Sequence, residues 1–228
     1  MKKIKTAGIV AVLILLAVLI GTAQAGDWPM MGHDPCHTRY LDSNIPNDLN
    51  LNWMADLPIR GGEVMQPIVN DGNIFVYYCS FMMASSQPIQ YEMLEEDNFF
   101  CLDEASGEIL WSFKVEKPPW SPWEVYSPCA ADGKIYIPCE TYLYCLDAKS
   151  GELLWKFTDQ TMRSGTRSTS PVAIGDRVYF MVSCEVYCIN RANGELIWKY
   201  TTRGGSRFPP AIDDNKLFVA NQVVSIIF

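Results

Sequence analysis

One pattern of residues occurs three times in this chain. Its copies are CLDEASGEILWSF at 101–113, CLDAKSGELLWKF at 145–157 and CINRANGELIWKY at 188–200. The glycines are 44 and then 43 residues apart, and so are the tryptophans: Gly107, Gly151 and Gly194, with Trp111, Trp155 and Trp198. A period in the forties with β-type strands is typical of propeller blades of about four strands. The repeat therefore predicts an all-β fold, a β-propeller of four-stranded antiparallel blades.

Each repeat divides into four short predicted strands. The first strand follows a proline in every copy: Pro67, Pro128, Pro171 and Pro210. A turn dipeptide then leads into the second strand, at Asp71-Gly72, Asp132-Gly133, Gly175-Asp176 and Asp214-Asn215. These residues tolerate positive φ and suit two-residue hairpins. We predict blades at about 66–117, 127–160 and 170–203, and a partial blade at 209–228, within a repeat region of 51–228.

The N-terminus predicts export. Three lysines precede an apolar run at 7–20, and Ala23-Gln24-Ala25 is typical of a signal peptidase site. We predict a signal peptide at 1–25 and an extended leader at 26–50, with an uncleaved membrane anchor as the alternative. The body of the protein is expected in the periplasm, at the cell surface or outside the cell. Removing the lysines changes the net charge from −8 to −11, which excludes nucleic acid as a partner.

Eight cysteines in an exported chain permit disulfides. Cys101, Cys145 and Cys188 occupy the same repeat position in different blades, so we predict that they pack as small apolar residues rather than pair. Cross-strand bridges between Cys139 and Cys145 or between Cys184 and Cys188 stay open as alternatives.

The leader contains a cluster that superficially resembles metal ligands: His33, Asp34, Cys36 and His37. Structural zinc needs four convergent ligands, and no second half with paired spacing is visible. We therefore predict a structural role and no metal site. An insertion within 80–97 is expected to project from one rim as a surface loop, either solvated or in contact with a partner.

The linkers before the first strands hold the candidate binding residues. Arg60, Arg163 and Arg203 recur there, and Trp120 and Trp123 lie in the equivalent linker of the second repeat. In a propeller these linkers cross one mouth of the central channel. The arginines there are expected either to bind an anionic ligand or acidic partner, or to be solvated charges on flexible crossovers. The tryptophans are expected to form an aromatic platform or to cap the core. No motif for a hydrolase or a nucleotide site occurs, and no catalytic residues are predicted.

At these residues the chain resembles the pyrroloquinoline-quinone (PQQ) enzyme repeat family of β-propellers. The resemblance rests on the Leu-Asp-x-x-Ser-Gly-Glu-Leu-Leu-Trp turn and on the leader D-W-P-M…H-D-P. It implies seven or eight blades in a complete ring, with Trp111, Trp155 and Trp198 docking between blades. The family includes quinoprotein dehydrogenases with adjacent paired cysteines and Ca²⁺, and non-enzymatic scaffolds. This chain has no adjacent cysteines, so PQQ and Ca²⁺ are not expected.

Segment 51–55 around Trp53 resembles an isolated fourth strand, and we predict that it completes the sheet formed by the C-terminus. The strand count then equals four blades. Three outcomes stay open: a fragment or gene remnant, half of an eight-bladed ring formed by self-association, or a four-bladed ring or open arc. We expect a non-enzymatic binding or scaffold protein. The alternatives are a fragment of a PQQ-dependent oxidoreductase and an incomplete propeller without independent function.

Overall fold

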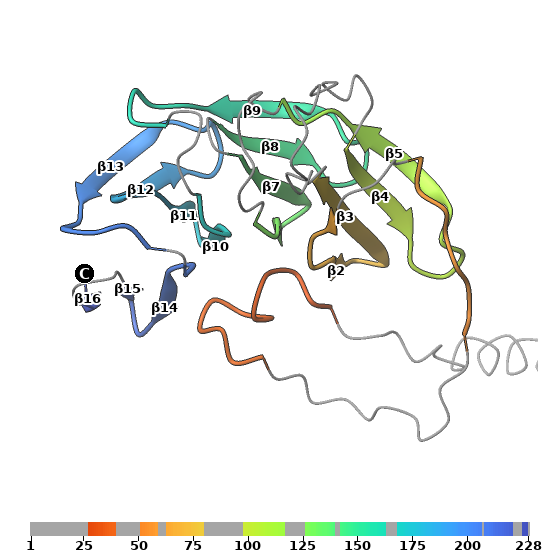
Figure 1. Ribbon diagram of the computed structural model, residues 1–228, viewed down its shortest axis with the longest axis horizontal. Helices are drawn as coiled ribbons and strands as arrows, with labels where there is room; N and C mark the ends of the chain where they lie inside the picture. The colour runs from red at the N-terminus through yellow and green to blue at the C-terminus, as the bar shows by residue number, and fades with distance from the viewer. Residues whose placement is uncertain are drawn as a thin grey trace, which may run out of the picture.

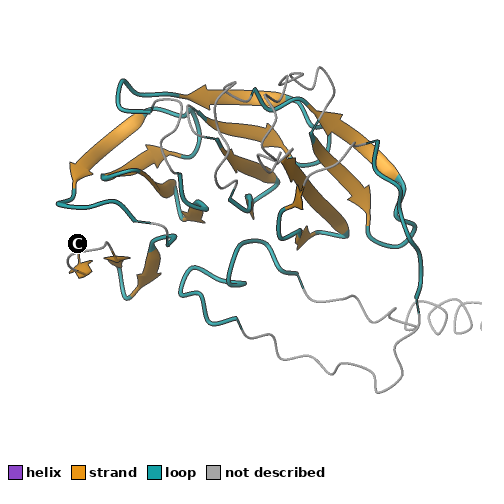
Figure 2. Cartoon of the chain, viewed as in Figure 1, coloured by secondary structure: helices purple, strands orange, loops and turns teal. Residues whose placement is uncertain are grey.

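A computed structural model describes residues 27–39, 51–58, 63–79, 98–116, 126–139, 142–162, 168–206, 208–220 and 225–227. These residues form strands, turns and loops (Figure 2). No helix of membrane-spanning length and hydrophobicity occurs among them. The predicted all-β propeller-type fold is confirmed.

The strands form four antiparallel sheets, each running in sequence order. The first contains β2 (Ile68–Asn70), β3 (Asn73–Cys79), β4 (Phe99–Asp103) and β5 (Ile109–Phe113), and β1 (Glu63–Val64) also pairs with β3. The second contains β6 (Cys129–Ala131), β7 (Lys134–Pro138), β8 (Leu143–Asp147) and β9 (Leu153–Phe157). The third contains β10 (Val172–Ile174), β11 (Arg177–Val182), β12 (Glu185–Asn190) and β13 (Leu196–Thr201). The fourth has three described strands: β14 (Ala211–Asp213), β15 (Lys216–Ala220) and β16 (Ser225–Ile227).

The predicted hairpin turns join the first two strands of each sheet. Asp132 and Gly133 have φ of 46° and 69°, and Asp214 and Asn215 have 49° and 58°. Two successive residues of positive φ match the right-handed twist of the paired strands, which explains why Asp, Asn and Gly recur here.

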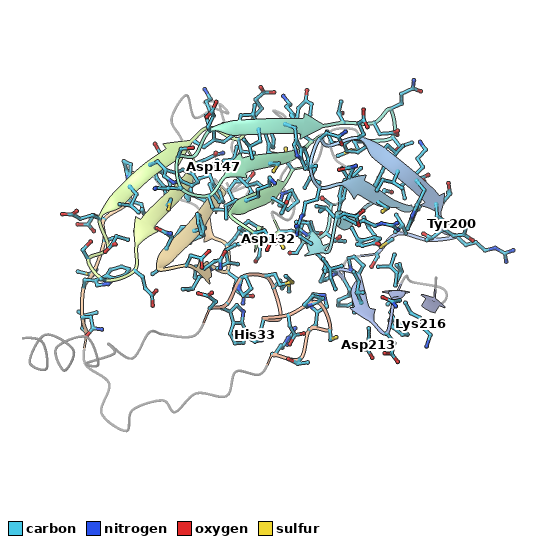
Figure 3. The ribbon with its side chains drawn as sticks, turned by 180° about the vertical axis from the view of Figure 1, so that it is seen from behind. His33, Asp132, Asp147, Tyr200, Asp213 and Lys216 are labelled. Atoms are coloured by element: carbon cyan, nitrogen blue, oxygen red, sulfur yellow. The ribbon has the colours of Figure 1, made fainter. Side chains whose placement is uncertain are left out.

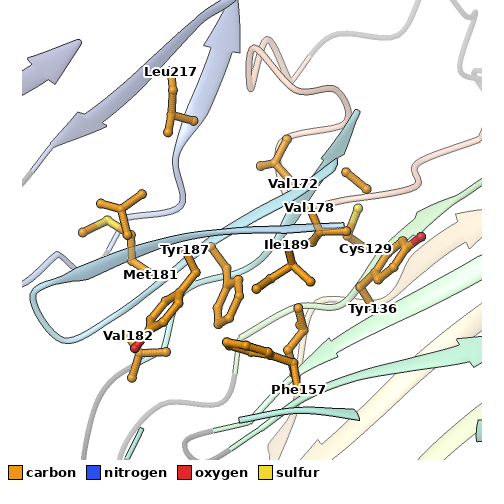
Figure 4. Packing of buried hydrophobic residues seen from close by; sticks show 14 of the residues in the cluster. Cys129, Tyr136, Phe157, Val172, Val178, Met181, Val182, Tyr187, Ile189 and Leu217 are labelled. Atoms are coloured by element: carbon orange, nitrogen blue, oxygen red, sulfur yellow. The ribbon is translucent and has the colours of Figure 1, made fainter. Parts of the chain in front are cut away.

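The sheets stand side by side along an arc, with β5, β9 and β13 on the convex side (Figure 1). Side chains alternate along each strand, so successive residues of β8 enter different cores. Leu143 and Cys145 pack toward the third sheet, whereas Tyr144 and Leu146 pack toward the first. Figure 4 shows the core between the second and third sheets.

The repeated cysteines are part of these cores. Cys101, Cys145 and Cys188 are fully buried and free, one in each of three sheets. The predicted packing role is confirmed. Cys139 and Cys184 are also free, so neither of the two hairpin bridges left open is formed.

The prediction that 51–55 completes the C-terminal sheet is wrong for this structure. Residues 51–58 pair with no strand in the described part of the chain and lie beside the first sheet, at the opposite end of the arc from β16 (Figure 1). The physical reason is that the two ends of the arc lie apart, so β16 does not reach this segment (Figure 1). Trp53 itself docks on the first sheet. Its Nε1 donates a hydrogen bond to the Glu104 carbonyl at 2.9 Å, and its ring lies against Gly107.

Candidate functional site

The first two junctions between neighbouring sheets each use one tryptophan and one glycine. Trp111 lies against Gly151 and donates from Nε1 to the Ala148 carbonyl at 3.2 Å. Trp155 repeats this contact with Gly194 and the Arg191 carbonyl, again at 3.2 Å. A Cβ atom on Gly151 would come within 2.6 Å of the indole, so the indole occupies the space that only glycine leaves open.

The junction beyond Trp198 differs from the others, because a pocket of about 800 Å³ opens there. It lies between β11 and β13 of the third sheet and the β14–β15 hairpin of the fourth. Trp198 and Tyr179 form one aromatic wall, with ring centroids 6.1 Å apart. Trp198 therefore lines a pocket in the described residues, whereas Trp111 and Trp155 lie against glycines.

Three cationic side chains line this pocket: Arg177, Lys199 and Lys216. The Arg177 Nε lies 3.4 Å from Asp176, and the Lys199 Nζ lies 3.1 Å from Asp159. Lys216 forms no ion pair within the described residues. Figure 3 shows Tyr200, another lining residue, and Lys216 at the same end of the molecule. The pocket thus combines positive charge with aromatic surface on a chain whose net charge is −8.

Local interactions keep the neighbouring charges ionised. Burial alone raises the pKa of Asp159, but hydrogen bonds from the Thr161 amide and hydroxyl and from Lys199 outweigh it, so the pKa lies below its usual value. A hydrogen bond with Tyr179 raises the pKa of Arg177. Asp159 and Arg177 are therefore both charged near neutral pH.

Of the five residues that were predicted to bind, the structure describes Arg203. Arg203 is exposed and follows β13, at the end of the third sheet opposite to the Gly175–Asp176 turn of the pocket. Arg60, Arg163, Trp120 and Trp123 lie outside the described residues, as does the insertion at 80–97. The described part of the chain therefore does not bring the predicted set together.

Sequence reasoning missed the pocket cations, although the repeat carries a signal for them. Lys134, Arg177 and Lys216 all begin the second strand of their sheet. Only the last two face the pocket. A comparison of charge at equivalent repeat positions would have singled them out, but not the open junction that exposes them.

The leader crosses the concave side of the arc and contacts the start of every sheet. Trp28 pairs with Val69 of β2, and the Pro29 carbonyl accepts from Ala130 of β6 at 2.7 Å. The Ser170 hydroxyl, just before β10, lies 3.5 Å from the Met31 sulfur. Pro35 of the leader contacts the fourth sheet, where the Ile212 amide donates to its carbonyl at 2.8 Å.

Side chains of the leader cluster also contact backbone carbonyls of the leader and of the fourth sheet region. The two ring nitrogens of His37 lie 2.6 Å from the Met31 carbonyl and 2.9 Å from the Pro210 carbonyl. The Cys36 thiol donates to the Ile212 carbonyl at 3.0 Å. Within the described residues, no three His, Cys, Asp or Glu side chains converge in a metal-binding group.

The sequence profile of a family described as outer membrane protein assembly factor BamB matches residues 50–223. The chain therefore belongs to this family of PQQ-like β-propeller repeat proteins. No curated protein sequence is matched by the chain.

Several solved structures share the fold at low sequence identity. BamB from Moraxella catarrhalis is 14% identical, with a TM-score of 0.50 over 72% of this chain and 42% of that one. The quinohemoprotein alcohol dehydrogenase ADHIIG from Pseudomonas putida HK5 is 17% identical, with a TM-score of 0.62 over 86% and 35%. The computationally designed Ika4 protein is 9% identical, with a TM-score of 0.55 over 76% and 94%. The chain thus spans less than half of the first two structures.

Proposed function

We propose that this PQQ-like propeller protein is a non-enzymatic binding module of the cell envelope that holds an acidic peptide segment in the pocket beside Trp198. The observation that carries the proposal is the gathering of three cations around an aromatic wall on an acidic protein. The family description, an outer membrane assembly factor, supports an envelope location.

The chemistry of the pocket favours carboxylates next to apolar side chains. Arg177 presents a planar fork of donors that suits a carboxylate, and Lys216 adds a charge without an ion-pair partner in the described residues. Trp198 and Tyr179 offer faces for an apolar side chain, because aromatic rings bury large areas at low entropic cost. A volume of about 800 Å³ is in the range of sites for ligands of several residues.

Calorimetric titration of the purified protein with an acetylated hexapeptide of alternating Glu and Leu tests this proposal. We expect saturable binding that weakens as salt rises, and no binding of the peptide in which Gln replaces Glu. Lys216→Glu should raise the dissociation constant at least about tenfold. A charge-assisted hydrogen bond contributes about 1.5–3 kcal/mol, and about 1.4 kcal/mol corresponds to a tenfold change. Lys149→Glu is the matched control, because Lys149 is exposed on a turn of the second sheet and outside the pocket. Equal binding of the Gln peptide, or equal loss in both variants, would refute the proposal.

We also propose that the chain works without PQQ and Ca²⁺. The dehydrogenases that the repeat resembles use a disulfide between adjacent cysteines, and no two cysteines are adjacent in this sequence. All seven cysteines whose side chains the structure describes are free, which does not fit that arrangement. Adding quinone and Ca²⁺ should produce neither a bound-quinone absorbance nor dye reduction with an alcohol substrate. Either signal would restore the oxidoreductase alternative.

Export itself has a direct test. Mass spectrometry of the protein recovered from the envelope fraction should give an N-terminus at Gly26 if the predicted signal peptide is removed. An intact Met1 in the membrane fraction would favour the anchor, and recovery in the cytoplasm would contradict export.

A further inference from the structure

One histidine of the leader, His37, connects it to the start of the fourth sheet. The His37 Nδ1 lies 2.6 Å from the Met31 carbonyl oxygen, and its Nε2 lies 2.9 Å from the Pro210 carbonyl oxygen. Met31 belongs to the leader, whereas Pro210 directly precedes β14. The imidazole ring therefore bridges two segments that are far apart in the sequence.

These two contacts require a proton on both ring nitrogens. A backbone carbonyl oxygen only accepts hydrogen bonds, so each contact needs an N–H group on the ring. Neutral imidazole has a single N–H, and its other nitrogen is an acceptor. In the neutral ring, one carbonyl oxygen would face a nitrogen lone pair at hydrogen-bond distance. The charged imidazolium is thus the form of His37 that satisfies both contacts.

The backbone of the leader places the ring in this position. The His37 amide donates to the Asp34 carbonyl at 2.9 Å, and the Arg39 amide donates to the Gly32 carbonyl at 2.9 Å. The ring lies against Gly32, where an added Cβ would come within 2.5 Å of the His37 Nδ1. Because Gly32 has no side chain, the ring can approach its backbone and reach the Met31 carbonyl.

The titratable groups near the ring come from the leader and from the fourth sheet: His33, Asp34, Cys36 and Arg39, and Asp213 and Lys216. Burial alone raises the pKa of Asp34, but hydrogen bonds from Thr38 outweigh it, so the pKa lies below its usual value. Burial, with the nearby carboxylates, raises the pKa of the Cys36 thiol. Histidine is the side chain that ordinarily changes charge between about pH 5 and 8. The sequence contains two histidines, and both lie in this contact.

We propose that His37 is a pH-sensitive latch on the leader, closed while its imidazolium bridges the Met31 and Pro210 carbonyls and opened when it releases its proton to solvent. The neutral ring keeps at most one of the two hydrogen bonds. Docking is therefore favoured at low pH and weakens as the pH rises through the histidine range. The leader crosses the concave side of the arc (Figure 1), so opening the latch loosens this cover at the fourth sheet. The inference does not depend on the acidic peptide of the proposed function.

Nuclear magnetic resonance of the purified, ¹⁵N-labelled protein between about pH 5 and 8 tests the latch. The ring-nitrogen signals distinguish imidazolium from the two neutral forms. We expect both His37 nitrogens to be protonated at the acidic end, and the Ile212 and Arg39 amide signals to shift with the same midpoint as the ring. Hydrogen exchange at the Ile212 amide, corrected for its intrinsic pH dependence, should lose at least about tenfold of its protection across this range, as expected for a lost hydrogen bond of a charged group.

Two matched variants, His37→Gln and His33→Gln, each remove one titrating ring. His37→Gln should abolish the pH response of the Ile212 amide, whereas His33→Gln should retain it. Unchanged amide signals from the second sheet verify that each variant is folded, and the titration of the unaltered protein is decisive without them. A neutral His37 ring at acidic pH in the docked leader would overturn the proposal. An Ile212 amide that ignores pH, or a response that His33→Gln removes, would do the same.

Discussion

Replacing Gly151 by alanine separates the two reasons for which this fold needs glycine. Gly151 has a φ of +72°, and its missing Cβ leaves room for Trp111, whose nearest ring atoms would lie 2.6 Å from an added Cβ. Gly133 has a similar φ of +69°, but nothing lies within 4 Å of the position of its Cβ. The Gly133→Ala variant therefore reports the backbone cost alone, and Gly151→Ala reports the backbone and the junction together.

The expected magnitudes follow from this geometry. Alanine in the left-handed region costs roughly 1 kcal/mol, so Gly133→Ala should lower the free energy of unfolding by about that amount. Gly151→Ala adds overpacking of about 1–3 kcal/mol, because a ring carbon cannot stay 2.6 Å from Cβ. Displacement of the indole also breaks the hydrogen bond from Trp111 to the Ala148 carbonyl, at about 1 kcal/mol. We expect Gly151→Ala to cost about 2–4 kcal/mol more than Gly133→Ala.

Urea unfolding monitored by circular dichroism gives the free energy of unfolding of both variants. The difference between the two values cancels the loss of unfolded-chain entropy that both glycine-to-alanine changes share. A third protein provides the internal check. In a Trp111→Ala background, Gly151→Ala should cost only about 1 kcal/mol, because the ring that it strikes is gone. Equal costs for Gly133→Ala and Gly151→Ala would refute the argument that the tryptophan fixes the glycine.

Three further predictions concern titration, a turn and the leader. Burial raises the pKa of the thiols of Cys101, Cys129 and Cys145 to about 12. The free energy of unfolding should therefore be constant below about pH 9 and fall above it, by up to about 1.4 kcal/mol per pH unit for each thiol. Chemical denaturation at about pH 8 to 11 measures this, and a flat profile would contradict the burial of the thiols. Asp147→Ala removes an acceptor for three hydrogen-bond donors in its turn and should lower the free energy of unfolding in urea by about 1 kcal/mol. Asp147→Asn keeps an acceptor oxygen and should retain most of the stability. Equal losses in the two variants would be inconsistent with Asp147 acting as a hydrogen-bond acceptor. His37→Ala removes two contacts to backbone carbonyls and should speed hydrogen exchange in the fourth sheet more than in the second; uniform acceleration would show that the leader does not hold that sheet.

Much of the fold follows from local sequence signals. The turn dipeptides are predictable because few residues accept positive φ, and Asp132-Gly133 and Asp214-Asn215 are found in that conformation. The strand order follows from the period of the repeat, and the burial of Cys145 follows from its position in each copy. Five candidate binding residues were predicted from the linkers, and of these the structure describes Arg203, which does not line the pocket.

The sequence by itself determined the repeated sheet, since turns and strand alternation depend on residues only a few positions apart. Tertiary structure decided which surfaces meet. Trp53 carries the sequence of a last strand and docks on Gly107, as Trp111 docks on Gly151, but only the structure shows that its segment pairs with no described strand. The path of the leader over all four sheets depends on contacts between residues far apart in the chain, which no local pattern records.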